Sequence, residues 1–115
     1  KSDGTNTSKA ITEKGYFTVT SSAITAFTAV AGDQLLVDTT QTTVTITLPA
    51  APAVGDEVVF IDARGTFASN NLTIERNGKP INSGTNNLAL ATNGQAITLV
   101  FIDSTRGWAY KTNTA

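Results

Sequence analysis

The chain has 115 residues and a formal net charge of −1, and its eight Lys and Arg residues are scattered along the sequence. Nucleic-acid binding normally requires clustered cations that neutralise phosphates, so no nucleic-acid partner is expected. The sequence contains no His and no Cys, which excludes imidazole and thiol nucleophiles, disulfides, Ser-His-Asp triads and zinc sites with nitrogen or sulfur ligands. No apolar run has the length of a membrane-spanning helix, so no membrane partner is expected either.

The composition predicts an all-β protein. Charged residues make up only 15% of the chain, and Thr, Asn, Ser, Gly and Ala are abundant instead. Thr is β-branched and suits half-exposed strands, whereas Asn and Gly suit tight turns that require positive φ. The length corresponds to one domain with a single modest core.

The first 14 residues, KSDGTNTSKAITEK, are polar and lack periodicity. We expect residues 1–14 to form an extended linker or stalk, and residues 15–115 to form the folded domain.

From residue 16 onward, apolar and β-forming residues recur in short runs that turn residues separate. The expected strands cover residues 16–20, 24–30, 34–38, 43–48, 57–62, 72–76, 88–90, 96–103 and 107–111. Asn77-Gly78 is a strong type I′ hairpin signal, and Asn93-Gly94 marks another turn. Pro49 and Pro52 exclude a central strand, so their segment is expected to cross between sheets or follow an edge.

No helical period of 3.6 residues is present in any long stretch of the sequence. Turns about every eight to twelve residues are typical of sandwiches and small barrels. The expected fold is an antiparallel, jelly-roll-like β-sandwich of about eight to ten short strands, preceded by the extended N-terminal segment.

The tetrapeptide Val-Phe-Ile-Asp occurs twice, at residues 59–62 and 100–103, and Arg-Gly follows each copy. If Asp62 and Asp103 lay side by side, about 5 to 9.5 Å apart, they could serve glycoside hydrolysis. Each Asp could instead end a core strand and accept hydrogen bonds from the backbone N–H groups of the turn that follows. The second interpretation is favoured because the paired acids would also need a cleft and more than the few aromatic platforms present. No catalytic residue is therefore expected.

The same interpretation assigns structural turn or interface roles to the residues around each copy. Glycine supplies the positive φ where the chain reverses, and each Arg can pair with the preceding Asp or a neighbouring loop. Phe60 and Phe101 point to one face of their strands and the flanking Val and Ile residues to the other. A strand that is apolar on both faces is either central in a sandwich or packed against another subunit. The residues with an expected turn or interface role are Asp62, Arg64, Gly65, Asp103, Arg106, Gly107, Phe60 and Phe101.

Oxygen ligands are plentiful, but none of them has the spacing of a calcium-binding loop. No metal ion and no cofactor is expected.

The segment from Gly32 to Tyr110 resembles a β-sandwich module of virion-surface proteins of tailed bacteriophages, of the tail-fibre or the capsid or neck-fibre type. The stretches that carry the resemblance are LLVDTT at residues 35–40, VTITLPAAPAVGDEVVFIDARGTF at 44–67, NLTIERNGKPI at 71–81 and ITLVFIDSTRGWAY at 97–110. The resemblance implies a structural module of the virion, such as a fibre, knob or decoration domain, that acts in assembly and in surface display or host attachment. It further implies a homotrimer that contacts other virion proteins and has no catalytic residues.

The alternative function is a carbohydrate-binding domain that recognises a host-surface glycan. Aromatic faces and Asn or Asp side chains would hold the sugar, and the candidate aromatic residues are Trp108, Tyr110 and Tyr16. As residues i and i+2 of one strand, Trp108 and Tyr110 share a face. The competing interpretation of Trp108 is that it covers one end of the core. A third hypothesis, a depolymerase acting on surface polysaccharide, requires the paired acids.

Overall fold

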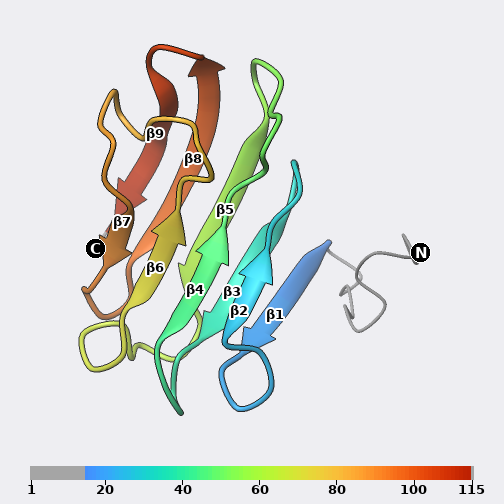
Figure 1. The fold of residues 1–115 in the computed structure, drawn as a ribbon. Helices are drawn as coiled ribbons and strands as arrows, with labels where there is room; N and C mark the ends of the chain where they lie inside the picture. The colour runs from blue at the N-terminus through green and yellow to red at the C-terminus, as the bar shows by residue number, and fades with distance from the viewer. Residues whose placement is uncertain (1–14, 115) are drawn as a thin grey trace.

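The computed structural model describes residues 15–114, so the stalk predicted for residues 1–14 lies outside the described residues. Within this range the chain is all-β, as expected, and none of its residues forms a helix that could cross a membrane. The nine strands of the described range fall within the expected number (Figure 1). They are β1 (Tyr16–Thr20), β2 (Ala26–Thr28), β3 (Gln34–Asp38), β4 (Val44–Thr47), β5 (Glu57–Asp62), β6 (Leu72–Glu75), β7 (Leu88–Leu90), β8 (Ala96–Asp103) and β9 (Gly107–Thr114).

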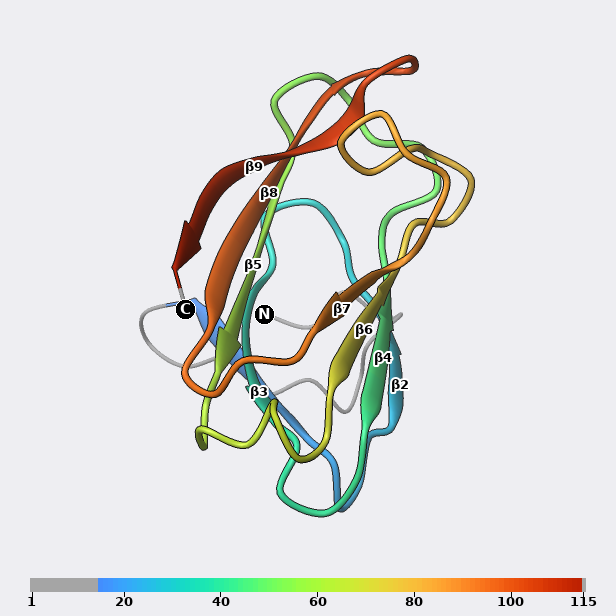
Figure 2. The same cartoon turned by 90° about the vertical axis from the view of Figure 1, so that its left-hand side faces the viewer.

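The strands form two sheets that face each other as layers of a sandwich-like fold (Figure 2). Sheet A has the strand order β1-β3-β5-β8-β9, and sheet B has the order β2-β4-β6-β7. Alternation along each strand places one set of side chains between the sheets, where they form a single hydrophobic cluster.

The two sheets are mixed, so the expectation of an antiparallel sandwich is wrong for the first six strands. These strands alternate between sheet A and sheet B, and each return places a strand parallel to the one two positions earlier. The antiparallel pairs among the described strands are β5 with β8, β6 with β7 and β8 with β9, so each of them includes one of the last three strands. A jelly roll, which is built from antiparallel strands, is therefore not confirmed. The period-2 pattern failed here because it defines the buried face of a strand and not the direction of its neighbour.

Parallel winding aligns apolar residues of successive turns in register. Phe17, Leu35 and Phe60 are consecutive partners across β1, β3 and β5, and each is at most 3% exposed. In sheet B, Ile46 and Ile74 are register partners and are fully buried. Complete burial of side chains of this size contributes about 1.5–3 kcal/mol each. These rows of buried apolar side chains therefore provide the main stabilisation of the parallel strands β1 to β6.

The Asn77-Gly78 turn forms, with φ values of 51° and 88° at its two residues and a bond from the Lys79 N–H to the Arg76 carbonyl. These values match a type I′ turn. The turn is only the first part of the connection between the adjacent strands β6 and β7, because the chain turns again at Asn82 and Ser83 before β7 begins at Leu88.

We predict that Gly107→Ala destabilises the fold strongly. Gly107 has a φ of 73°, and a Cβ atom there would lie 1.8 Å from the Pro80 carbonyl oxygen. A positive φ alone costs a non-glycine residue about 1–2 kcal/mol. Gly65→Ala is the matched control, because Gly65 has a φ of 68° but open space around the added Cβ.

Urea unfolding of both variants separates the two effects. We expect Gly65→Ala to lose about 1–2 kcal/mol and Gly107→Ala to lose at least about 2 kcal/mol more, because the backbone must move. Equal losses of unfolding free energy in the two variants would show that the close approach to Pro80 does not contribute to the effect.

Candidate functional site

Asp62 is the last residue of β5 and Asp103 is the last residue of β8. Because these neighbouring strands run in opposite directions (Figure 1), the two aspartates lie at opposite ends of sheet A. Strands β5 and β8 are antiparallel, with Glu57 opposite Val100 and Ile61 opposite Ala96. Asp62 lies level with Gln95, because its N–H donates to the Gln95 carbonyl. Asp103 follows Gln95 by eight residues of extended strand, so the two aspartates are about 25 Å apart at about 3.3 Å per residue. Glycosidase carboxylates lie at most about 9.5 Å apart. The hypothesis that this pair acts on one glycosidic bond is therefore wrong.

The carboxylate of Asp62 instead organises the chain around it. Its Oδ1 accepts hydrogen bonds from the N–H groups of Arg64, at 3.3 Å, and Thr66, at 3.1 Å. Its Oδ2 accepts from the N–H groups of Phe67, at 3.1 Å, and Gly94, at 2.9 Å. One side chain thus fixes both the loop that leaves β5 and the turn that precedes β8.

The ionised form of Asp62 is favoured. The residue is only 8% exposed, and this burial by itself would raise its pKa. The backbone hydrogen bonds from Gly94, Phe67, Thr66 and Arg64 outweigh the burial and lower the pKa below the ordinary value of an aspartyl group.

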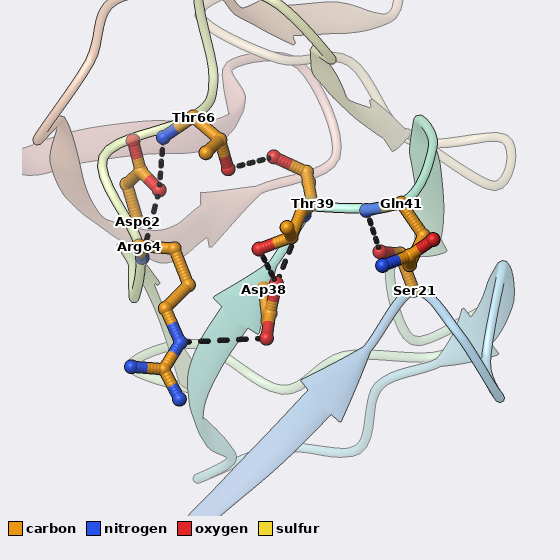
Figure 3. A network of polar contacts seen from close by, with 8 residues as sticks. Ser21, Asp38, Thr39, Gln41, Asp62, Arg64 and Thr66 are labelled. Atoms are coloured by element: carbon orange, nitrogen blue, oxygen red, sulfur yellow. Dashed lines mark hydrogen bonds and ion pairs between the residues drawn. The ribbon is translucent and has the colours of Figure 1, made fainter.

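A row of polar contacts connects the ends of the three parallel strands of sheet A (Figure 3). It runs across the segments that follow β1, β3 and β5. Its members are Thr66 to Thr39 at 2.6 Å between their hydroxyls, Arg64 Nε to Asp38 at 3.5 Å, and Gln41 N–H to Ser21 Oγ at 2.9 Å. The Arg64 side chain is 67% exposed, so its ion pair contributes at most about 1 kcal/mol.

At the other end of sheet A, Asp103 makes only local bonds. Its Oδ1 accepts from the N–H groups of Thr105, at 2.9 Å, and Arg106, at 2.6 Å. Arg106 reaches a neighbouring loop, where its Nη2 donates to Asn82 Oδ1 at 3.1 Å. Asp103 is exposed, so these bonds compete with water.

The three candidate glycan-binding aromatics do not form one platform. Trp108 is 0% exposed and packs edge-on against Phe101, with ring centroids 5.5 Å apart, so its indole offers no face to a ligand. Tyr16 lies in β1 and Tyr110 in β9, which are the two edges of sheet A. Tyr110 is 40% exposed.

Tyr110 lines a shallow hollow between β9 and the segment that leads into β7. The hollow measures about 290 Å³, and the other residues that line it are Ile81, Asn82, Gly84, Asn86, Asn87 and Leu88. Residues 82–87 contain three asparagines, and none of them is among the site residues expected from the sequence. Their density in NSGTNN, directly before a strand, was the available signal.

The outer face of sheet A is apolar at its centre. Phe60 and Phe101 point into the core, at 0% and 4% exposure. Val59, Ile61 and Val100 lie on the other side of the sheet and remain partly exposed. Ile102, at the end of β8, is 41% exposed.

Among the described residues, no group of three or more His, Cys, Asp or Glu side chains could hold a metal ion.

Replacing Asp62 with Asn should destabilise the fold by about 2–4 kcal/mol at neutral pH, because an amide cannot accept all four N–H bonds. Asp103→Asn is the matched control, and we expect a loss of less than about 1 kcal/mol because its partners are exposed. Urea unfolding at pH 7 measures both. Similar losses in the two variants would contradict the anchoring role of Asp62.

The pH dependence of folding stability gives an independent test of the role of Asp62. Because its pKa is lowered in the folded state, ionised Asp62 stabilises the fold above the unfolded-state pKa of about 4, and this contribution is lost as the pH falls through the lower folded-state pKa. The Asp62→Asn chain should lose less stability than the wild type between pH 5 and strongly acidic pH. An equal loss of stability on acidification in the wild type and the Asp62→Asn chain would contradict this expectation.

No protein-family model matches the sequence, and no curated protein matches it significantly. Function is therefore argued from the residues and their arrangement.

Proposed function

We propose that this chain is a structural module of a tailed-phage virion, a fibre, knob or decoration domain that acts in assembly and in surface display or host attachment. In this proposal it forms a homotrimer, contacts other virion proteins and performs no catalysis. The proposal draws on the resemblance of Gly32–Tyr110 to virion-surface modules. The observation that carries it is the apolar outer face of sheet A.

This outer face is contiguous because the register joins its apolar residues across strands. Leu36, Ile61 and Ala96 are consecutive partners across β3, β5 and β8. In the next row on this face, Val59 lies between Gln34 and Thr98. One row beyond that, Val100 lies between Glu57 of β5 and Ala109 of β9. The outer side of a sheet that faces water normally alternates to polar residues. Contiguous apolar patches on such a face mark interaction surfaces, whereas single exposed apolar residues do not.

The outer face of sheet B has a different character. Thr45 and Thr73 are register partners there, and Thr47 donates a hydrogen bond to Glu75 at 3.0 Å. Threonine hydroxyls on this face can remain hydrated in a free subunit. The contrast between the two faces supports assembly through sheet A.

We predict that the chain is oligomeric in solution and that Ile61→Lys shifts it toward the monomer. A lysine in the middle of the apolar face would have to bury its charge in the subunit contact, which costs several kcal/mol. Ile61 is partly exposed in the single chain, so the lysine can reach water in the monomer. Sedimentation equilibrium over a range of protein concentrations measures the mass.

The matched control is Thr45→Lys, which places the same charge on the exposed outer face of sheet B. Its mass should equal that of the wild type. A wild-type chain that stays monomeric at about 100 µM, or an Ile61→Lys variant with unchanged mass, would count against assembly through sheet A.

A further inference from the structure

The segment between β6 and β7 lines two surface hollows that share Asn87, and the two hollows together are called the groove below. The Tyr110 hollow is one part of this groove, and a second hollow of about 220 Å³ adjoins it, lined by Glu75, Arg76, Asn77, Gly78 and Asn87. Asn87 belongs to both hollows. Each hollow is smaller than the range of about 300–1,000 Å³ that is typical of small-molecule sites, but the two together have space for a ligand of two small rings.

The wall of the groove is held in place by backbone contacts. Asn82 and Ser83 form a tight turn with φ values of 53° and 69°, which are uncommon for residues other than glycine. The Asn82 N–H donates to the Trp108 carbonyl at 2.6 Å, and the Ser83 N–H donates to the Arg106 carbonyl at 2.8 Å. The turn is thereby attached to the start of β9, the strand that carries Tyr110. Backbone strain that the surrounding structure maintains is a frequent feature of binding sites.

The groove presents polar groups that the described residues leave without partners. The Asn86 amide and the Tyr110 hydroxyl make no hydrogen bond to any other described residue. The Oδ1 of Asn82 accepts a hydrogen bond from the Arg106 side chain, and the Oδ1 of Asn87 accepts one from the Arg76 N–H. The Nδ2 groups of both asparagines remain available to a ligand. A primary amide offers both donors and an acceptor in one plane.

Apolar surface lies beside these polar groups. Leu88 and Ile81 line the first hollow together with the Tyr110 ring. No charged side chain of the described chain lines this hollow. In the second hollow, the Arg76 guanidinium already donates to the carbonyls of Thr85, at 2.8 Å, and Lys79, at 3.2 Å.

We propose that this groove binds a neutral saccharide, with one sugar ring against Tyr110 and a second in the adjoining hollow. A pyranose ring has an apolar face of C–H groups that suits an aromatic ring, and hydroxyls that suit the asparagine amides. The absence of a free cation in the first hollow disfavours a phosphorylated or carboxylated ligand. This proposal gives the carbohydrate-binding alternative a defined site and a neutral ligand, and it does not depend on assembly through sheet A.

The test is a titration of the ¹⁵N-labelled chain followed by two-dimensional NMR. The probes are methyl β-glucoside, methyl β-galactoside and N-acetylglucosamine at up to about 20 mM, together with the disaccharides lactose and cellobiose. We expect shifts confined to residues 75–88 and 107–110 and to the side-chain amides of the three asparagines. A matching disaccharide should bind several-fold more tightly than its monosaccharide.

Variants identify the contacts. Tyr110→Ala should weaken binding roughly tenfold and Tyr110→Phe much less, because the phenylalanine keeps the ring. Asn86→Ala should weaken it roughly fivefold. Asn113→Ala is the matched control, because Asn113 is an exposed asparagine of the same strand that does not line the groove, and its affinity should equal that of the wild type. Unchanged core resonances confirm that each variant is folded.

The proposal is overturned if no neutral saccharide shifts these resonances, or if Tyr110→Ala binds as tightly as the wild type. Binding of N-acetylneuraminic acid alone would overturn the assignment to a neutral ligand. The Ile61→Lys variant should bind with wild-type affinity, which separates this result from the test of assembly.

Discussion

The fold depends on the four backbone hydrogen bonds that the buried carboxylate of Asp62 accepts. Asp62 ends β5, the last parallel strand of sheet A and the strand against which β8 packs in the opposite direction. Two of its bonds hold Thr66 and Phe67, and the Phe67 side chain is fully buried in the core. A third holds Gly94, which precedes β8. The carboxylate therefore lies where the parallel winding ends and the antiparallel strands begin. Without it, four N–H groups close to the core would lack an acceptor, which is more costly than the loss of an exposed contact.

The strands were predictable from the sequence almost residue by residue, but their arrangement was not. Alternation in residues 16–20, 34–38 and 57–62 located β1, β3 and β5 with their observed bounds. The same alternation fits a parallel and an antiparallel neighbour equally well, because it reports only which side chains are buried. The turn signal between β6 and β7 correctly indicated antiparallel neighbours but not the length of their connection. Asn77-Gly78 adopts the geometry of a hairpin turn, yet β6 meets β7 only after a second turn. The direction of each strand follows from which sheet the chain enters after a loop, and loop composition does not encode that choice.

The candidate site shows the same limit. Sequence reasoning correctly placed Trp108 and Tyr110 on one side of their strand, since their β8 partners Phe101 and Leu99 both point inward. It could not separate their environments. Trp108 is covered by the segment around Ile81, which bridges to it. Sheet B ends at β7 and provides no strand opposite Tyr110, and Figure 2 shows the second half of β9 diverging from sheet B. One tryptophan is therefore core, and a tyrosine two residues later is accessible.

The two proposed roles use opposite sides of sheet A, and this makes them compatible. The face proposed for assembly is the outer side, with Val59, Ile61 and Val100, whereas the proposed groove lies on the inner side of β9 beyond the edge of sheet B. Lys111 separates them: it follows Tyr110 and pairs across the outer side with Glu57 at 2.9 Å. A neighbouring subunit packed on the outer face would cover the apolar rows and leave Tyr110 and the asparagines open to solvent. In a homotrimer the groove would then be present three times, and weak binding at each copy would be strengthened by simultaneous attachment to a surface that carries many copies of the sugar.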